Sequence, residues 1–236
     1  MIVAQGASAV RAISQATRTL PIVFPVAGDP VGAGLVETLA RPGGNVTGFI
    51  NIEGSMSGKW LELLREMVPH VNRVVFLFNP ATAPYFDYYL NPFKNAAQSF
   101  ALEAIAAPIH DKAELESVIS GQAQQPNTGL IVMPDGFNIN HRREITSLAA
   151  RYRFPAVYPQ RIYPDVGGLL SYGNDPLDNF RRAANYADRI LRGSKPGELP
   201  VQVPVKFELV INLKTAKALG LELPPTLLAR ADTVIE

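Results

Sequence analysis

Short apolar runs alternate along the chain with longer segments in which apolar side chains recur every three or four residues. The short runs predict strands at residues 2–4, 22–26, 46–50, 74–78, 103–109, 129–133, 155–158, 168–171 and 207–212. The periodic segments predict helices at residues 8–18, 31–39, 57–68, 85–102, 112–122, 140–152, 176–192, 213–219 and 224–231. Apolar strands that alternate with helices are typical of a parallel sheet covered on both faces, so the pattern predicts an α/β protein.

The alternation falls into two groups, which predicts two lobes. Residues 1–48 read strand–helix–strand–helix–strand, and residues 52–172 hold five further strands with helices between them. We expect one hinge crossing at residues 47–51 and another at residues 171–175. The expected division is 1–48 plus about 175–198 for the first lobe, 49–174 for the second, and 199–236 for a segment that returns across the hinge.

The first strand begins at residue 2 with no segment leading into it. A domain that starts in mid-strand is typical of a fragment, and the sequence therefore predicts that the natural precursor has more chain before Met1.

Composition narrows the class of function. The 236 residues are 47% hydrophobic and 18% charged, which is typical of a globular protein, and the net charge of +1 offers no field to gather nucleic acid or an anionic membrane. There is no cysteine, which excludes disulfides, thiolate nucleophiles and cysteine-ligated metals. No apolar run reaches the roughly 18 residues of a membrane span.

Catalytic signatures are missing from the sequence. His70, His110 and His141 have no metal-ligand partners at a suitable spacing, and we interpret them as surface residues. There is no nucleophile elbow, phosphate loop or dinucleotide fingerprint, so we expect no cofactor, no metal and no enzyme activity. The one alternative left open is a racemase-like or lyase-like enzyme that uses Asp29 and Asp135 as an acid–base pair.

Ligands of parallel-sheet proteins bind at the carboxyl ends of the strands. In the first lobe this edge carries Gly6, Ala7, Ser8, Gly28 and Asp29. Asp29 precedes Pro30, and it either caps a helix that begins there or helps to present backbone N–H groups to an anionic ligand. A hydroxyl at Ser8 is suited to hold a carboxylate.

In the second lobe the strand ends carry acids, amides and aromatics. Asp135 either caps the following helix or accepts a hydrogen bond from a ligand ammonium group, and Phe137 is either core or a cover for the ligand side chain. Tyr85 is the aromatic of its segment that we expect to line the cleft. The remaining candidates are Asn79, Tyr158, Ser171, Tyr172 and Gly173, and the two tyrosines are equally compatible with core packing.

Several long motifs in this order resemble one family, the ABC transporter substrate-binding proteins that include tryptophan/tyrosine-type binding proteins. The similarity spans nearly the whole chain. It is carried by residues 21–31, the Leu39-Ala40-Arg41-Pro42-Gly43-Gly44-Asn45-Val46-Thr47-Gly48 segment, residues 74–80, 130–135 and 171–173, and the tail at 206–220 and 227–236.

The resemblance implies a type I periplasmic-binding-protein fold, in which two Rossmann-like lobes joined by a hinge close on a ligand. It implies a periplasmic or membrane-anchored extracytoplasmic protein that delivers an amino acid or related organic solute to a membrane permease. Carried over to this chain, residues 6–8 and 28–29 are the ligand loops of the first lobe. Asn79, Tyr85, Asp135, Tyr158 and residues 171–173 belong to the second.

The chain departs from the family pattern at its start. Members begin with an export signal and about one further βαβα unit, so we expect a truncated first lobe with an exposed sheet edge. Such an edge invites pairing, which predicts a homodimer or a swapped assembly. The effector-sensing domain of a transcription regulator shares this fold and remains an alternative.

Overall fold

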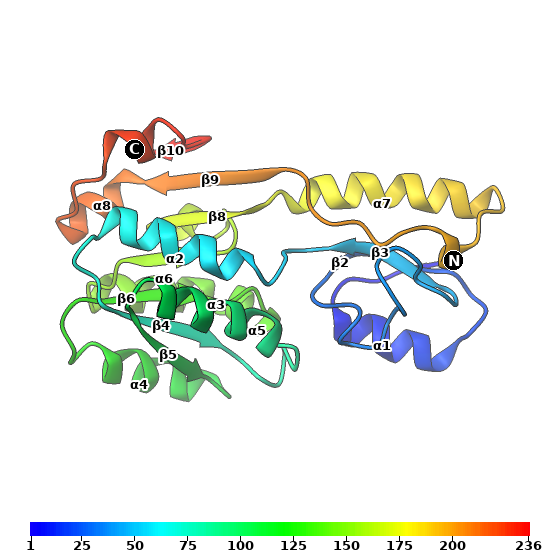
Figure 1. Ribbon diagram of the computed structural model, residues 1–236, viewed down its shortest axis with the longest axis horizontal. Coiled ribbons are helices and arrows are strands. Elements are labelled where there is room, and N and C mark those ends of the chain that lie inside the picture. Colours follow the sequence, from blue (N-terminus) through cyan, green and yellow to red (C-terminus); the bar gives the residue numbers. More distant parts are fainter. The chain divides into compact units, whose positions relative to one another are not determined.

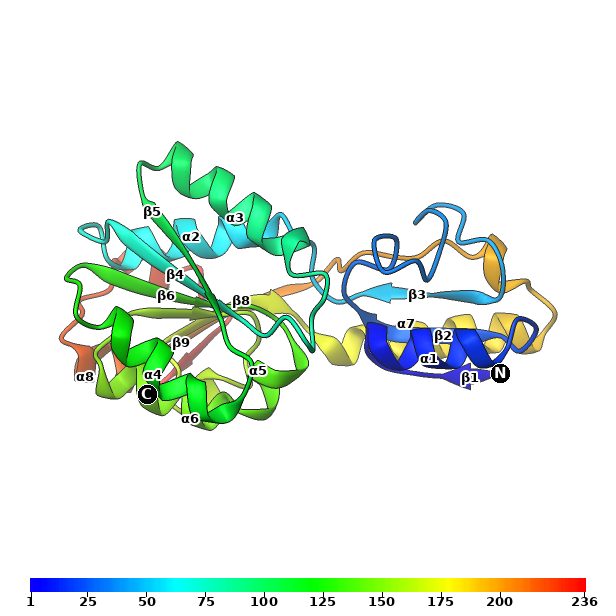
Figure 2. The same cartoon turned by 90° about the horizontal axis from the view of Figure 1, so that it is seen from below.

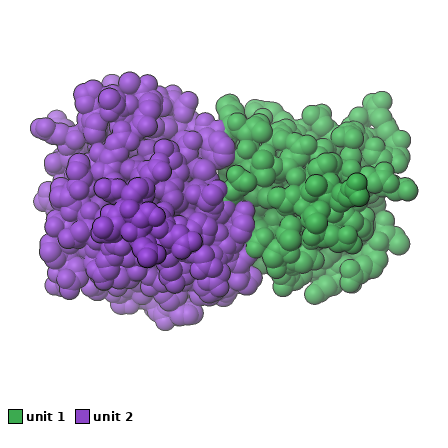
Figure 3. All heavy atoms as spheres, in the orientation of Figure 1, with its two compact units in different colours: residues 1–53, 174–206 green, residues 54–173, 207–236 purple.

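The computed structural model describes all residues from Met1 to Glu236, and they form two compact units. Unit 1 comprises residues 1–53 and 174–206, and unit 2 comprises residues 54–173 and 207–236 (Figure 3). The chain therefore passes from one unit to the other three times, after residues 53, 173 and 206. Each unit is built on one sheet of its own.

Unit 1 holds a three-stranded parallel sheet in the order β1-β2-β3. Its elements are β1 (Ile2–Val3), α1 (Ala7–Ala16), β2 (Ile22–Ala27), β3 (Val46–Ile50), α7 (Pro176–Leu191) and the 3-10 turn η2 (Pro196–Glu198). Helices α1 and α7 lie on opposite faces of this sheet (Figure 1). The sheet is thus covered on both sides, as its apolar strands require.

The core of unit 1 lies between the sheet and α7. Val23 of β2 and Phe49 of β3 pack against Ala183, Tyr186 and Ile190, which recur at helical spacing along α7. Helix α7 begins at Pro176, and the Asp175 side chain accepts a hydrogen bond from the Leu177 N–H at 2.9 Å. The Pro and Asp at this start are favourable helix signals, which explains why the sequence predicts α7 to within a residue.

The helix expected at residues 31–39 is not formed, and the segment is a series of turns. Gly34 adopts a left-handed backbone with φ of +66°, and the N–H groups of Leu35 and Val36 both reach back to the Pro30 carbonyl. Two glycines in so short a stretch lower its helix propensity, and turn bonds take the place of helical ones.

Unit 2 holds a seven-stranded sheet in the order β10-β9-β8-β7-β6-β4-β5. The strands are β4 (Arg73–Phe78), β5 (Glu103–Pro108), β6 (Thr128–Val132), β7 (Ala156–Tyr158), β8 (Leu170–Asn174), β9 (Phe207–Asn212) and β10 (Thr233–Ile235). Strand β4 pairs in parallel with β5 and with β6, and β6 pairs in parallel with β7. The sequence pattern misses β10, which is short and half-exposed.

The helices of unit 2 are α2 (Met56–Met67), α3 (Asp87–Ser99), α4 (Lys112–Gln122), α5 (Gly136–Asn140), α6 (Arg142–Arg151), α8 (Leu213–Leu219) and α9 (Pro225–Leu228), with the 3-10 turn η1 (Pro164–Val166). Helices α2 and α3 cover one face of the sheet, and α4 and α6 cover the other (Figure 2). The helix expected at residues 140–152 corresponds to α6, and the short helix α5 that precedes it, separated from α6 at His141, is not expected from the sequence pattern. No helix is long and apolar enough to span a bilayer.

Candidate functional site

The carboxyl ends of β4 and β6, which are neighbours in the sheet of unit 2, are joined by the side chain of Asp135. Its Oδ2 accepts hydrogen bonds from the Asn79 N–H at 3.1 Å and from the Asn138 Nδ2 at 2.8 Å. Its Oδ1 accepts from the Asn138 N–H at 2.8 Å and from the Thr82 hydroxyl at 3.3 Å. Both oxygens are occupied, and only 2% of the residue is exposed.

Asn79 and Asn138 extend this arrangement into the two loops. The Asn79 Oδ1 accepts from the N–H groups of Ala81 and Thr82, both at 2.9 Å, which folds the chain back directly after β4. The Asn138 Nδ2 also donates to the carbonyls of Leu77 and Met133, at 3.2 and 3.0 Å. The amides therefore fix the backbone at both strand ends, and the Asp135 carboxylate binds the two loops together.

Burial dominates the electrostatics of Asp135. Desolvation raises the pKa of its carboxyl from 3.8 to about 6, although the N–H groups of Asn138 and Asn79 act in the opposite direction. Removing a carboxylate from water disfavours its charged form, and here the donors offset that cost only in part. The carboxyl therefore titrates near neutral pH while it holds the two loops.

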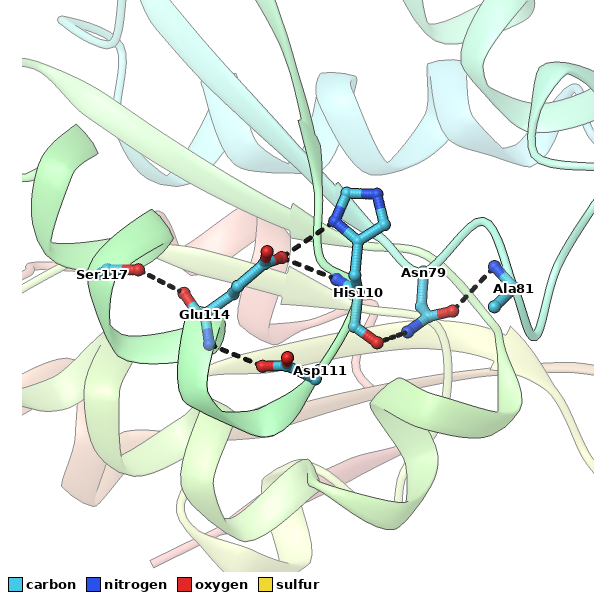
Figure 4. A network of polar contacts seen from close by, with 6 residues as sticks. All are labelled: Asn79, Ala81, His110, Asp111, Glu114 and Ser117. Carbon is cyan, nitrogen blue, oxygen red and sulfur yellow. Dashed lines mark hydrogen bonds and ion pairs between the residues drawn. The ribbon is translucent and has the colours of Figure 1, made fainter.

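A second polar network continues from Asn79 to the end of β5 (Figure 4). The Asn79 Nδ2 donates to the His110 carbonyl at 3.2 Å. Glu114 accepts from the His110 N–H and contacts its Nδ1, both at 2.9 Å. The backbone hydrogen bond from His110, followed by the side-chain one, lowers the pKa of the Glu114 carboxyl. Three neighbouring strand ends are thus connected through side chains.

One local pattern recurs at the strand ends of unit 2. Asn79, Asp111 and Asp135 each follow a strand and Asn212 ends β9, and each accepts a hydrogen bond from the N–H three residues on. This is the geometry of a helix N-cap or an Asx turn. Asn79 and Asp135 are among the expected site residues, whereas Thr82 and Asn138 are not, although each lies three residues after one of them.

Aromatic side chains flank the polar network. Phe137 follows Asp135 at the start of α5, is half-buried, and stacks on the His141 ring with centroids 4.2 Å apart. Tyr85 is half-buried in the loop between β4 and α3, with its ring centroid 6.4 Å from that of Tyr89. These are the partly exposed aromatics among the candidates near Asp135.

Tyr158 has a different role from the one expected as a ligand residue. It is 1% exposed within the hydrophobic core, and its ring stacks on Tyr163 with centroids 4.8 Å apart. Desolvation raises the pKa of both phenols. The neighbouring Ser171, paired in register with Tyr158, is also buried at 1% exposure. We therefore assign Tyr158 to core packing, the alternative that the sequence left open.

Tyr172 and Gly173 end the first passage of the chain through unit 2. The Tyr172 ring stacks on Phe207 with centroids 5.8 Å apart, and both rings line a pocket with Leu63. The Tyr172 carbonyl accepts from the Trp60 Nε1 at 2.6 Å. These contacts place Tyr172 against α2 and β9 and apart from the Asp135 network.

In unit 1 the candidates gather at the carboxyl ends of β1 and β2. The Gly6 N–H donates to the Val26 carbonyl at 2.8 Å, which brings the start of α1 beside the end of β2. Ser8 is exposed in the first turn of α1, where backbone N–H groups have no partner inside the helix. Gly28 is buried beside this corner.

Asp29 closes a turn instead of capping a helix. Its Oδ1 accepts from the Gly32 N–H at 2.9 Å, and its own φ of +28° is unusual for a residue with a side chain. Of the two candidate loops at residues 6–8 and 28–29, the corner formed by Gly6, Ala7 and Ser8 is therefore the one that presents helix N–H groups. The structure contains no group of three or more histidine or acidic residues placed to hold a metal ion.

Comparison with known proteins identifies the class. The family model described as ABC transporter substrate binding protein matches residues 1–235. The chain belongs to this family. Its members are binding proteins, which sets aside the enzyme alternative for Asp29 and Asp135.

The relatives agree with this assignment. A tyrosine-binding protein of Clostridioides difficile (strain R20291) is 25% identical over 225 residues, and these cover 94% of this chain. The chain spans 63% of the length of this curated relative.

Two solved structures also superpose on the chain. An ABC domain in complex with L-Trp from Streptococcus pneumoniae is 26% identical, with a TM-score of 0.91, over 100% of this chain and 80% of that one. A conserved domain protein from Vibrio cholerae is 29% identical, with a TM-score of 0.91, over 99% of this chain and 78% of that one. The two parallel sheets thus resemble those of type I periplasmic binding proteins, which confirms the expected fold class.

Proposed function

We propose that this protein binds a free amino acid with an aromatic side chain and delivers it, chemically unaltered, to an ABC permease on the extracytoplasmic side of a membrane. The observation that carries the proposal is the family match over residues 1–235, together with a relative of the same fold that holds L-Trp. A transcription-regulator effector domain has no comparable support, since the sequence relationship is to transport proteins.

The start of α1 is the group that we assign to the ligand carboxylate. A helix N-terminus offers backbone N–H donors and a partial positive charge to an anion. Ser8 adds an exposed hydroxyl at the same corner, and Gly6 leaves the approach to the first turn without a side chain. Gly28 and Asp29 support this corner from the neighbouring strand end.

In unit 2 we assign the ligand side chain to Phe137 and Tyr85, which are partly exposed and aromatic. An aromatic amino acid gains both apolar burial and ring contacts from such side chains.

We assign Asp135 a positioning role in place of the ammonium contact suggested by the sequence. Its carboxylate is 2% exposed and already accepts four hydrogen bonds, from Asn79, Thr82 and Asn138. The carboxylate therefore has no free face for a ligand amine. It holds in place the loops that carry Tyr85 and Phe137. Its effect on affinity is therefore indirect, through the geometry of those loops.

The hydroxyl of Ser8 supplies one test of this arrangement. The Ser8→Ala variant is expected to bind the amino acid roughly fivefold more weakly, because a hydrogen bond to a carboxylate is lost, at about 1 kcal/mol. Ser14→Ala is the matched control, since Ser14 lies on the same helix and its hydroxyl donates to the Arg11 carbonyl at 2.9 Å. Isothermal titration that gives both variants the same affinity would contradict the carboxylate assignment.

Phe137 supplies a second, independent test. The Phe137→Ala variant is expected to bind an aromatic amino acid about tenfold more weakly, because it loses the contact between the two rings and the apolar area that this contact buries. Phe100→Ala is the control, because Phe100 is a half-buried aromatic at the far end of α3, under the guanidinium of Arg65. Equal losses in the two variants would rule out Phe137 as a ligand contact.

A further inference from the structure

Asn51 of unit 1 has a buried amide oxygen that the fold does not use. The residue is 6% exposed, and its Oδ1 has no hydrogen-bond partner in the protein. Buried polar atoms are nearly always paired, because an unpaired acceptor has lost its contact with water and gained nothing in return. Asn179 of the same unit shows the usual case, since its Nδ2 donates to the Ile50 carbonyl at 3.0 Å. The unpaired oxygen of Asn51 is therefore not explained by the packing of unit 1.

The backbone fixes Asn51 at the carboxyl edge of the unit 1 sheet. Asn51 directly follows β3, and its N–H donates at 3.0 Å to the carbonyl of Ala27, the last residue of β2. On the other side of β3, the Ile50 N–H donates to the Gln202 carbonyl at 2.8 Å. None of these contacts involves β1, which lies at the far side of the sheet. Asn51 is thus held at the edge where parallel sheets bind their ligands.

The corner assigned to the ligand carboxylate lies on the opposite side of the same strand end. The Gly6 N–H donates to the Val26 carbonyl, whereas the Asn51 N–H donates to the carbonyl of the next residue, Ala27. The start of α1 and Asn51 therefore flank the end of β2, about two strand spacings or roughly 10 Å apart. Gly28 follows Ala27 and places no side chain between them.

A free amino acid has the dimensions to reach both sides of this strand end. Its carboxylate and ammonium groups are attached to the same carbon atom, and a hydrogen bond at each end adds about 2.8 Å. With the carboxylate at the start of α1, the ammonium group is therefore within reach of the side chain that follows β3. That side chain is Asn51, whose amide oxygen is an acceptor without a donor.

We propose that the Asn51 Oδ1 accepts a hydrogen bond from the ammonium group of the bound amino acid. This inference rests on the proposed function, and it assigns the part of the ligand that Asp135 cannot take because both of its oxygens are occupied. A ligand without the ammonium group leaves the Asn51 oxygen buried and unpaired. A site that hydrogen-bonds a ligand group in this way discriminates against analogues that lack the group.

Two other residues of unit 1 are competing acceptors. Asp29 follows Gly28 and carries a charge, but its Oδ1 accepts from the Gly32 N–H at 2.9 Å, which turns the side chain toward its own loop. Asn174 is 4% exposed and its amide also has no partner, but it ends β8, a strand of the unit 2 sheet. Asn51 alone combines an unpaired oxygen with a place at the end of the unit 1 sheet.

Isothermal titration of the chain of residues 1–236 with two ligands tests the proposal. L-tryptophan carries the ammonium group, and indole-3-propionic acid keeps the ring and the carboxylate but lacks it. The unsubstituted protein is expected to prefer L-tryptophan at least tenfold. Asn51→Leu is expected to reduce that preference at least fivefold by weakening the binding of L-tryptophan alone. Asn51→Asp is expected to keep the preference, because a carboxylate also accepts a hydrogen bond from an ammonium group.

The stability of Asn51→Leu separates a ligand contact from a structural role. Because the Asn51 oxygen has no partner to lose, the leucine is expected to leave the unfolding midpoint of unit 1 unchanged or to raise it. Far-ultraviolet circular dichroism in denaturant measures that midpoint. Asn179→Leu is the matched control, since Asn179 is 1% exposed and paired with the Ile50 carbonyl. It is expected to lower the midpoint without changing the preference between the two ligands.

Three outcomes would overturn this inference while leaving the proposed function in place. One is an unsubstituted protein that binds both ligands equally well. Another is an Asn51→Leu variant that weakens both ligands by the same factor. The third is a preference that Asn51→Leu keeps and Asp29→Asn loses, since the ammonium group would then lie on Asp29. A folded chain that binds neither ligand would instead overturn the proposed function, and this inference with it.

Discussion

Replacing Asp135 with alanine is expected to lower the free energy of unfolding of unit 2 by about 3 kcal/mol or more. The change removes four hydrogen bonds and leaves the Asn79 and Asn138 donors buried without partners. Trp60 is the only tryptophan and is fully buried in unit 2, so its fluorescence reports this unfolding in denaturant. A midpoint within error of the unsubstituted protein would contradict the positioning role.

The pH dependence of stability separates the charge of Asp135 from its hydrogen bonds. Burial raises the pKa of its carboxyl to about 6, above the 3.8 of an exposed aspartate, so the folded protein binds a proton that the unfolded chain releases. Proton binding by Asp135 therefore stabilises the folded protein fully below the pKa of the unfolded chain, and this stabilisation is lost as pH rises through about 6. Relative to Asp135→Asn, the free energy of unfolding of the unsubstituted protein is expected to fall by about 1.4 kcal/mol between roughly pH 5 and pH 7.5.

Asp111→Asn is the matched control for that measurement. Asp111 also caps a helix, with its Oδ1 accepting from the Glu114 N–H at 3.0 Å, but it is exposed. Its variant is expected to follow the pH profile of the unsubstituted protein. If Asp135→Asn followed that profile as well, the carboxyl of Asp135 would not be the titrating group.

Gly48→Ala is expected to destabilise unit 1 by about 3 kcal/mol or more, the range of a steric clash that a packed core cannot relax. A Cβ at Gly48 would lie 2.0 Å from the backbone carbonyl oxygen of Phe24, its registered neighbour on β2. Since Trp60 reports unit 2, far-ultraviolet circular dichroism is expected to show an early loss of structure in denaturant before the Trp60 fluorescence changes.

Gly121→Ala is the control with the opposite sign. Gly121 lies in α4, where an added Cβ would meet nothing within 4 Å, so alanine is expected to stabilise the helix by about 0.5–1 kcal/mol. If Gly48→Ala proved as harmless as Gly121→Ala, β2 and β3 would not approach each other closely enough at Gly48 to exclude a Cβ atom.

The sequence predicts the fold well where hydrophobic periodicity and helix caps agree. Helix α7 begins at Pro176 as expected, and strands such as β2 and β6 are largely apolar, buried runs. Prediction failed where short segments depend on tertiary contacts. Residues 31–39 form turns, partly because the Arg11 side chain donates to the Ala33 carbonyl at 2.7 Å, a contact that no local pattern reveals.

For the candidate site, the sequence located the strand ends but could not assign side-chain roles. Asp135 and Tyr158 both follow from the rule that ligands bind at the carboxyl edge of a parallel sheet. Their burial then distinguishes both residues from the partly exposed Phe137. The Asp135 carboxylate already accepts hydrogen bonds at both oxygens, and Tyr158 is packed in the core. Which way a side chain turns at a strand end depends on the loops around it, which periodicity does not describe.

The proposed function requires that this protein bind an aromatic amino acid without altering it. Isothermal titration of the folded chain with L-tryptophan and L-tyrosine tests this directly, with L-alanine and tryptamine as controls that lack the ring and the carboxylate. We expect saturable binding of one L-tryptophan or L-tyrosine per chain, recovery of the intact ligand by mass spectrometry, and much weaker binding of both controls. Binding of tryptamine as tight as that of L-tryptophan would show that the carboxylate is not recognised. No heat from either amino acid with a chain shown to be folded would overturn the proposed function.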